Sequence, residues 1–567
     1  MIQRGWIAFL LFVCCFSPLF ATDTKQLSQD AYWLKLLHFR DGISEIDAPQ
    51  FFLSPKGKTD PKAELEATID ALYHDKSVFC RFPARVRWLF AHVPKLEADV
   101  AYKPCKALET LKASYKTSKA VLIFPTAHIN SPASMFGHTF LRLDDKSGLA
   151  LTANAVNYAA KTAETNGLIF AYKGLFGGYE GRYSVLPYYK KIKEYNHLEH
   201  RDIWEYTLNL NDQELDRLLT HLYELRDVYA NYYFFTENCS YNLLWLLEVA
   251  RPSAHLVNQF HIKAIPIDTI RAIKKAGFIT KAHFRPSKTK HIEALLTASK
   301  KAKGGLKKAY KAELDVALLQ LKRSQGKIKK KPYIKALMEK LHKRSALEKI
   351  PKLMITPPAN PLRAHKSARL ALGLDSKQRV RFGMKLAFHD IYDVDQGFVK
   401  GAYIDFFHLM LEKYKSEIKL QKLDLVNINS YALRDTIFSP ISWGVAFGEQ
   451  RFREQDNFSL RGEVGLSYAL GERAFAFVML AEKFYYHDKP LIGAGPKLGV
   501  LASFEKLKCG MIGEQDFYAD GVKEAHGEVF GTIMIGKESA INLKAKYDKI
   551  DKEKANHSIA ASLFYYF

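Results

Sequence analysis

Hydrophobic and polar residues alternate along the C-terminal part of the chain, from about residue 367 to the last residue. The apolar positions of one such segment are Val380, Phe382, Met384, Leu386 and Phe388. A period of two predicts β-strands with one apolar and one polar face. About twelve segments of about ten residues fit between Ser367 and Phe567, which is typical of a membrane-spanning β-barrel.

A soluble β-sandwich also has alternating strands, so the period by itself leaves two architectures open. An export signal favours the barrel: Met1–Ala21 carries Arg4 before an apolar run, and the small Ala21 precedes the cleavage point. The chain also ends on Leu-x-Tyr-x-Phe, which resembles the assembly signal of bacterial outer-membrane proteins. We therefore expect an outer-membrane barrel over residues 358–567, with Cys509 as a small apolar residue in one strand.

Upstream of the barrel the apolar residues recur at helical spacing. Residues 22–118 are predicted to be mostly helical, with helices over 30–37 and 61–73. From Ala120 the pattern changes to short strands, expected at residues 120–124, 139–143, 150–158 and 202–210, followed by an amphipathic helix at 212–226. The Gly- and Tyr-rich stretch 173–183 indicates a cluster of turns. Residues 119–255 are thus expected to form an α+β domain.

Positive charge is concentrated in one part of the chain. Of the net charge of +24, 15 charges lie between Lys288 and Lys352, where 20 Lys and Arg residues face 5 Asp and Glu residues. Leucines recur there at helical spacing, so residues 256–357 are expected to form basic amphipathic helices linking two domains. A solvated helical face and an anionic membrane surface both fit this charge, whereas nucleic acid is not expected as a partner of an exported chain.

Export implies an oxidising compartment, in which cysteines can pair. After removal of the signal four cysteines remain, and four cysteines allow three fully paired arrangements. Cys80 and Cys105 lie close together in the sequence, so a disulfide between them is the simplest arrangement. That pairing leaves Cys239 free.

Two short motifs carry candidate chemistry. The stretch 136–142 is predicted to be a strand that carries His138, and Cys239 stands where an apolar-periodic helix begins. A thiol at a helix N-terminus meets free N–H groups and the positive end of the helix dipole, which favour the thiolate, and a nearby imidazole would complete a nucleophile. The alternative is that Cys239 is a small buried apolar residue and His138 a buried histidine of the core.

The residues from Cys80 to Pro252 resemble the periplasmic domain of Lnb-type lipoprotein intramolecular transacylases. The motifs that carry the resemblance span residues 80–85, 134–142, 157–160, 201–206 and 237–242. The resemblance implies a permuted papain-like fold in which the histidine strand precedes the cysteine helix. It also implies Cys239 as nucleophile and His138 as its base. Such enzymes move an acyl chain from glycerol to the α-amine of a lipoprotein N-terminus, but this chain has a predicted barrel in place of helical spans.

Several other residues are candidates for supporting roles. Asn157, Asn154 and His128 could orient His138, and Asn238 or Ser134 could donate to an oxyanion together with the Cys239 N–H. Arg142 could bind a phosphate, or it could form an internal ion pair. His197 and His200 have no Cys partners at zinc-site spacing, so no metal is predicted, and no cofactor is expected.

The leading hypothesis is an outer-membrane-anchored thiol acyltransferase or lipase, with its catalytic domain in the periplasm. It would act on acyl esters of lipoproteins or membrane phospholipids through a thioester. A papain-like amidase or peptidase that cuts peptidoglycan is a second hypothesis. A barrel protein whose periplasmic domain binds envelope components without catalysis is a third.

Overall fold

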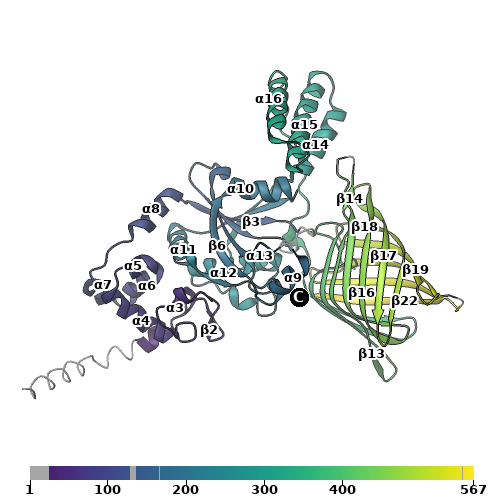
Figure 1. The fold of residues 1–567 in the computed structure, drawn as a ribbon, viewed down its shortest axis with the longest axis horizontal. Coiled ribbons are helices and arrows are strands. Elements are labelled where there is room, and N and C mark those ends of the chain that lie inside the picture. Colours follow the sequence, from purple (N-terminus) through teal and green to yellow (C-terminus); the bar gives the residue numbers. More distant parts are fainter. Residues whose placement is uncertain (1–23, 128–135, 165, 436, 552) are drawn as a thin grey trace, which may run out of the picture. The chain divides into compact units, whose positions relative to one another are not determined.

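The computed structural model describes residues 24–127, 136–164, 166–435, 437–551 and 553–567 (Figure 1). The predicted export signal lies outside these residues. The chain divides into two units between Ile355 and Thr356, and the segment Thr126–Gly137 is grouped with the second unit. None of the helices in the described part of the chain combines the length and apolarity that a membrane crossing requires.

The N-terminal region is helical, as predicted. Its helices are α3 (Ala31–Leu36), α4 (Pro61–His74), α5 (Val78–Arg81), α6 (Pro83–His92), α7 (Pro94–Asp99) and α8 (Lys106–Tyr115), with a small hairpin of β1 (Phe39–Arg40) and β2 (Ile43–Ser44). Helix α4 begins where local chemistry favours it. The Asp60 carboxylate accepts hydrogen bonds from the N–H groups of Lys62 and Ala63, each at 3.0 Å, and Pro61 has no N–H to satisfy.

A buried ion pair joins these helices. The Arg85 guanidinium lies 2.7 Å from the Glu64 carboxylate, and both side chains are fully buried. Arg85 also donates to the carbonyl of Phe51 at 2.8 Å, and Glu64 accepts from the backbone N–H of Leu53 at 3.0 Å. These additional partners satisfy charges that would otherwise be costly to bury.

The next domain is built on a seven-stranded antiparallel sheet with the order β8-β6-β5-β4-β3-β7-β9. The strands are β3 (Lys119–Pro125), β4 (Phe140–Asp144), β5 (Asn154–Lys161), β6 (Glu180–Pro187), β7 (Ile203–Leu208), β8 (Tyr229–Asn231) and β9 (Ile279–Arg285). The strands predicted at 120–124, 139–143 and 202–210 correspond to β3, β4 and β7. The strand predicted at 150–158 begins late, because Ala150–Thr152 forms a 3₁₀ turn.

The domain also contains helices. They are α9 (Gly167–Leu175), α10 (Tyr188–Ile192), α11 (Asp212–Glu224), α12 (Cys239–Ala250) and α13 (Pro266–Lys275), with a π-helical turn at Lys193–Leu198. The predicted helix at 212–226 is α11, which starts with a capping box between Asn211 and Glu214. The stretch 173–183 is only partly a turn, because it contains the end of α9 and the start of β6.

Gly174 shows why a glycine stands inside α9. A Cβ atom at this position would lie 2.3 Å from the ring of Phe234, so only glycine allows the helix to approach that ring. The aromatic contact between Phe170 and Phe234, with ring centroids 5.0 Å apart, completes this packing.

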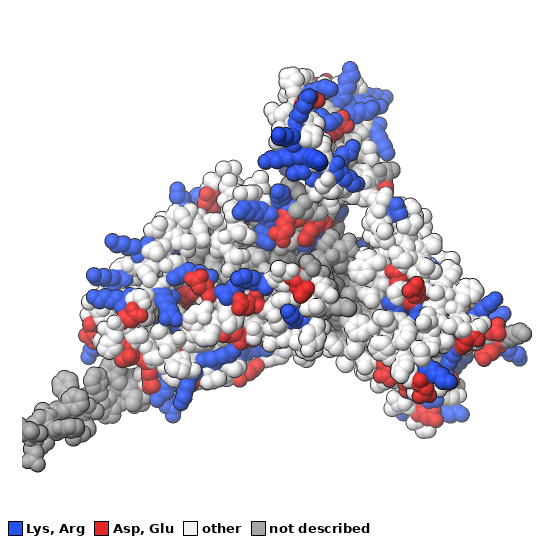
Figure 2. Space-filling view, in the orientation of Figure 1, with Lys and Arg blue, Asp and Glu red and all other residues white. Residues whose placement is uncertain are grey.

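The basic segment forms three helices, as its periodicity predicts: α14 (Lys288–Lys301), α15 (Gly304–Ser324) and α16 (Lys330–Ser345). Helix α14 packs on α15, and α15 packs on α16. Lys and Arg side chains gather over these helices (Figure 2). Strand β9 also lies beyond residue 255, within the stretch expected to be a linker, yet it pairs with β7 and belongs to the sheet.

The C-terminal unit is a closed twelve-stranded antiparallel barrel, which confirms the predicted architecture. Its strands are β10 (Arg369–Asp375), β11 (Val380–His389), β12 (Ala402–Tyr414), β13 (Glu417–Ser430), β15 (Ser442–Phe452), β16 (Gln455–Leu470), β17 (Ala474–Tyr486), β18 (Pro490–Ser503), β19 (Leu507–Tyr518), β20 (Lys523–Met534), β21 (Ser539–Ile550) and β22 (Asn556–Tyr566). Strand β10 pairs with β22, which closes the first strand of the barrel on the last. A short strand, β14 (Leu433–Arg434), runs parallel to β16.

The barrel strands have an apolar outer face and a polar inner face. Leu543 and Leu563, which the alternation places on one face, are 56% and 51% exposed, whereas Asn542, the residue before Leu543 on β21, is 3% exposed. An apolar outer face is unfavourable in water and is typical of a barrel that is surrounded by lipid. Cys509 lies half-buried in β19 and is not disulfide-bonded.

Candidate active site

Cys239 is the first residue of α12, as the sequence predicts, and Asn238 is its N-cap. The Asn238 side-chain oxygen accepts from the N–H groups of Ser240 at 3.0 Å and Tyr241 at 3.3 Å. Its amide nitrogen donates to the carbonyls of Phe234 at 3.0 Å and Ala264 at 2.7 Å. The Asn238 side chain is therefore engaged in holding the start of the helix, which leaves little of it for a substrate oxygen.

The Cys239 thiol is 2% exposed. Burial raises the pKa of this thiol above its ordinary value of 9.0, although hydrogen bonds from the Thr139 backbone N–H and the Tyr232 hydroxyl to the sulfur oppose the rise. The resting group is therefore a neutral thiol, whereas the helix N-terminus alone would predict a thiolate. Desolvation outweighs the helix dipole because the thiolate would have to exist away from water.

His138 lies just before β4, and its backbone N–H donates to the carbonyl of Pro125 at 3.3 Å. Its ring is 5% exposed, and its Nε2 lies 2.8 Å from the Oδ1 atom of Asn157 on β5. A carboxamide oxygen only accepts, so Nε2 carries the proton and Nδ1 keeps a lone pair. That lone pair is what a general base requires.

Burial is the main cause that lowers the pKa of His138 to about 3. The Asn157 hydrogen bond opposes this effect, and the positive charges of Lys191 and Arg201 add to it. The imidazole is therefore neutral at physiological pH. The thiol and the imidazole are both uncharged for the same reason, their burial.

Thr139 connects the two candidate groups. It directly follows His138 in the chain, and its backbone N–H is one of the hydrogen-bond donors to the Cys239 sulfur. The His138 ring also lies 5.5 Å from the ring of Tyr195, on the π-helical turn. The Arg201 guanidinium lies over the Tyr195 ring, 4.9 Å from its centre. The sheet thus brings His138 and Asn157 together, and α12 brings Cys239 to Thr139, the residue that follows His138.

Helix α12 is held from two sides. On the sheet side the Tyr183 hydroxyl donates to the carbonyl of Asn242 at 2.6 Å. On the side of the N-terminal helices the Trp245 indole donates to Glu45 at 2.8 Å, and Lys35 pairs with Glu248 at 3.1 Å. These contacts fix the helix whose first residue is the thiol.

Arg142 is engaged inside the domain. Its Nε lies 2.6 Å from Asp144 and its Nη1 lies 2.9 Å from Glu205, and the side chain is 6% exposed. Of the two alternatives that the sequence left open, the internal ion pair is the one present. Asn154 lies on β5 three positions before Asn157, so its side chain points to the other face of the strand.

The remaining predicted residues are placed as follows. Cys80 and Cys105 form the predicted disulfide, and Cys239 is not disulfide-bonded. His128 and Ser134 lie outside the described residues. In the described part of the chain, two buried groups could bring metal ligands together, and both lie in the barrel unit: the first is His365, His389 and Asp393, and the second is Asp390, Asp405 and His408.

Sequence reasoning missed Tyr232. Its hydroxyl accepts from the Cys239 backbone N–H at 3.2 Å, so it occupies the position where the N–H would otherwise meet a substrate oxygen. Tyr232 follows β8 in a loop with no periodic pattern. No signal in the sequence pointed to it, because its proximity to Cys239 depends on how this loop folds back to α12.

A helical region, an α/β domain with a buried thiol at a helix start and a buried histidine, and a closed barrel with an apolar outer face define an outer-membrane protein with an additional domain. Comparison with protein families identifies that domain. Residues 107–276 match the Lnb N-terminal periplasmic domain, which confirms the resemblance seen in the sequence. Residues 358–566 match a domain of unknown function (DUF7840), and residues 25–92 match another (DUF7843). The chain thus combines a segment that matches the Lnb N-terminal periplasmic domain with an outer-membrane β-barrel.

Solved structures resemble the barrel. The NanC porin is 6% identical, with a TM-score of 0.26, and the match covers 35% of this chain and 100% of that one. The KdgM porin is 10% identical, with a TM-score of 0.24, over 35% of this chain and 99% of that one. The COG4313 outer membrane channel from Pseudomonas putida F1 is 8% identical, with a TM-score of 0.25, over 39% and 100%. No curated protein matches the chain.

Proposed function

We propose that the periplasmic domain is a thiol acyltransferase or lipase that acts on acyl esters of lipoproteins or phospholipids. The observation that carries the proposal is the position of Cys239 at the start of α12, where Thr139, the residue after His138, donates to its sulfur, while His138 is bonded through Nε2 to Asn157. In this reading the fold is a permuted papain-like one, because the histidine strand precedes the cysteine helix. The match to the Lnb periplasmic domain supports lipoprotein processing as the setting.

The first step forms a thioester. As the substrate binds, the Cys239 proton moves to Nδ1 of His138, and the sulfur attacks the ester carbonyl carbon. A C–S bond forms and the ester C–O bond breaks. The proton on His138 passes to the leaving alkoxide, so a lyso product departs as a neutral alcohol.

The second step releases the acyl chain. An incoming amine attacks the thioester carbon and gives its proton to His138, while the sulfur leaves and takes a proton back. With an amine the product is an N-acyl lipoprotein, and with water it is a fatty acid. Asn157 is a positioning residue in both steps, because it keeps the proton of the resting imidazole on Nε2.

The negative oxygen of each tetrahedral intermediate needs hydrogen-bond donors. The Cys239 N–H and the Tyr232 hydroxyl are the proposed donors, since they lie beside the sulfur and already contact each other. The substrate oxygen would displace the hydroxyl from the N–H and accept from both. Asn238 is excluded from this role by its own hydrogen bonds.

The acyl-enzyme provides the test. Purified full-length protein is incubated with a diacylated lipopeptide, quenched in acid, digested and examined by mass spectrometry. We expect an acyl mass on the peptide that contains Cys239, and its loss after treatment with hydroxylamine. His138→Ala and Cys239→Ala should leave no acyl mass. Cys509→Ala is the matched control, because it removes the other unpaired cysteine of the described chain without touching the site.

Peptidoglycan hydrolysis is the competing function, since the same thiol and imidazole could cleave an amide. Muropeptides and diacylated lipopeptides are therefore compared as substrates under identical conditions. Cleavage of muropeptides that depends on Cys239, with no acyl mass from lipopeptides, would reject the acyl-transfer proposal. A Cys239→Ala strain with normal lipoprotein N-termini and normal peptidoglycan would leave the domain as a binding module.

A further inference from the structure

The segment between β11 and β12, residues 390–401, leaves the barrel wall and folds into the lumen. We refer to it as the lumen strap. Asp390, Asp393, Val394 and Asp395 of this segment are each less than 10% exposed. An ordinary hairpin connection at the rim of a barrel is exposed to water, so burial of charged side chains requires partners inside the barrel.

Tyr392 connects the strap to β20 and β21 of the barrel wall. Its hydroxyl donates to Glu528 on β20 at 2.8 Å, and its ring lies 4.9 Å from that of Phe530 on the same strand. The Lys544 ammonium on β21 lies 3.3 Å from the centre of the Tyr392 ring. A cation over a buried ring adds attraction to the packing.

Asp393 ties the strap to the first and last strands of the barrel. Its carboxylate pairs with Arg369 on β10 and with Lys385 on β11. It also accepts from the Tyr566 hydroxyl on β22 at 2.9 Å. The four side chains are each less than 5% exposed, so the carboxylate has its charge balanced away from water.

Asp395 ties the strap to the next part of the wall. It pairs with Lys508 on β19 at 2.8 Å, and it accepts from the hydroxyl of Ser503 on β18. Gln396 donates to Glu505, in the turn between those two strands, at 3.3 Å. Together with the Tyr392 and Asp393 contacts, the strap reaches β10, β11, β18, β19, β20, β21 and β22.

Aromatic and aliphatic side chains fill the remaining cross-section at this level. Ile391 and Tyr392 of the strap pack against a buried cluster of Tyr403, Tyr431, Phe475, Phe477, Met479, Leu501 and Phe530. The rings of Tyr431 and Phe477 are stacked with centroids 4.3 Å apart. Interiors packed in this way leave few voids large enough for water.

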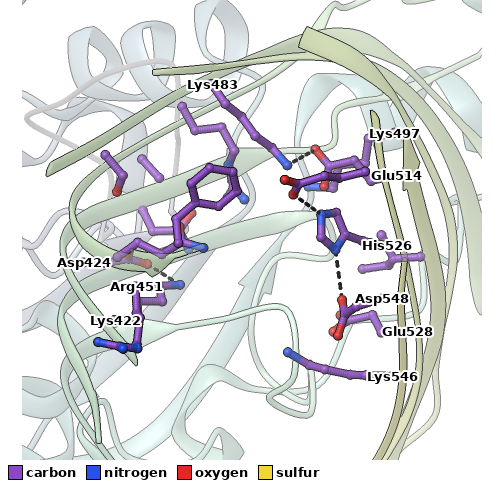
Figure 3. A pocket seen from close by; sticks show the side chains of 18 of the residues that line it. Lys422, Asp424, Arg451, Lys483, Lys497, Glu514, His526, Glu528, Lys546 and Asp548 are labelled. Atoms are coloured by element: carbon purple, nitrogen blue, oxygen red, sulfur yellow. Dashed lines mark hydrogen bonds and ion pairs between the residues drawn. The ribbon is translucent and has the colours of Figure 1, made fainter. Parts of the chain in front are cut away.

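Beyond the strap the lumen is a charged cavity of about 480 Å³, and Ile391 and Tyr392 are among the residues that line it. Figure 3 shows its charged side chains projecting from several strands of the wall. Lys483 lies 3.0 Å from Glu514, and His526 lies 2.9 Å from Asp548. The cavity is therefore polar and suited to water, and a second cavity of about 230 Å³ reaches Asp390 and Tyr392 of the strap.

We propose that the lumen strap seals the barrel, so that its lumen is a blind cavity and the barrel is a non-conducting anchor. The strap closes the end at which β10 begins and β22 ends. Asp393 and Asp395 are held by cations on β10, β11 and β19, and Tyr392 packs against β20 and β21. Movement of the strap would expose these charges without their partners, which opposes spontaneous opening.

Electrical recording from the full-length protein tests the seal. The protein is purified in detergent, its barrel is verified by faster migration on a gel before boiling, and it is inserted in planar lipid bilayers in potassium chloride. We expect no stepwise increase in current. Vesicles that contain the protein should likewise retain an entrapped sugar at the rate of protein-free vesicles. Current steps or sugar efflux with the wild-type protein would overturn the proposal.

Two variants assign the seal to the strap. Tyr392→Ala removes one ring and no charge, so folding should be retained, and it should produce small current steps. The combined variant Tyr392→Ala, Asp393→Asn and Asp395→Asn should produce larger ones. Asp488→Asn, in the exposed turn between β17 and β18, is the control and should stay silent. If folded Tyr392→Ala and the folded combined variant both remain silent, the strap is not the seal and the assignment is wrong.

Discussion

Replacement of Asn157 by alanine tests how the imidazole is held. In the native domain the Asn157 Oδ1 atom lies 2.8 Å from Nε2 of His138, and the two side chains are 3% and 5% exposed. Alanine removes the acceptor and leaves the imidazole N–H buried without a partner. A buried donor that loses its acceptor costs about 1–3 kcal/mol, and this is the expected loss in free energy of unfolding.

The same substitution should affect chemistry more than stability. Without the carboxamide the proton is no longer fixed on Nε2, and the ring can turn away from the thiol. Misplacement of a reacting group by about 1 Å can reduce a rate on the order of 100-fold, so we expect acylation of Cys239 to slow by about that factor. A lost structural contact alone would lower the melting temperature without changing the rate measured well below it.

The assay combines thermal unfolding, followed by tryptophan fluorescence, with the rate of acyl-enzyme formation at 25 °C. Asn154→Ala is the matched control, because Asn154 lies on the same strand with its side chain on the opposite face. It should change the free energy of unfolding by less than about 0.5 kcal/mol and leave the rate unaltered. If Asn157→Ala acylates at the wild-type rate, Asn157 does not position His138 and the reasoning fails.

Four further outcomes are expected. The pKa of His138 is about 3 in the folded domain against an ordinary value of 6.5, so the unfolded state binds the proton more tightly. The free energy of unfolding should therefore fall by about 1.4 kcal/mol per pH unit as the pH drops from 6.5 towards 3. In urea unfolding, His138→Gln should show a weaker pH dependence than the wild-type protein. Arg85→Met should lower the free energy of unfolding in urea by about 3–5 kcal/mol, because it leaves the Glu64 carboxylate buried without its cation. If Arg85→Met loses less free energy of unfolding than the double variant Glu64→Gln, Arg85→Met, this explanation is contradicted. Without reductant, iodoacetamide should label Cys239 slowly, at a rate that still rises above pH 9, and fast labelling at pH 7 would contradict its raised pKa. Deletion of Phe567 should slow barrel assembly, measured as the fraction that shifts on a gel with heating, and unchanged assembly would show that the terminal ring is dispensable.

The barrel could be predicted from the sequence because lipid imposes one rule on every strand. The positions that face lipid are mostly apolar, so along each strand apolar residues recur at every second position, as they do around Leu543 on β21 and Leu563 on β22. The α/β domain has no such constraint, and its short elements were missed. Strand β8 has three residues, and β9 has mostly exposed side chains on both faces, so neither gives a periodic signal.

The candidate site was predictable to the extent that it depends on local sequence. Cys239 could be assigned to a helix start from the Asn before it and the leucines after it, and that is where it lies. Tyr232 could not be assigned, because its contact with Cys239 arises from a loop that returns to the helix. The protonation state of Cys239 could not be predicted from the sequence either, because burial of the thiol arises only in the folded domain.

In the proposed mechanism, burial keeps both the Cys239 thiol and the His138 imidazole neutral until the substrate binds. With the pKa of the thiol raised and that of the imidazole lowered, proton transfer from Cys239 to His138 is unfavourable before the substrate binds. A buried thiol that stays protonated reacts slowly with oxidants, which suits an exported protein in an oxidising compartment. The hydrogen bonds from Thr139 and Tyr232 to the sulfur stabilise the thiolate once it forms. In the proposed mechanism the site thus remains unreactive at rest, and its fixed donors lower the cost of charge when the proton moves to His138.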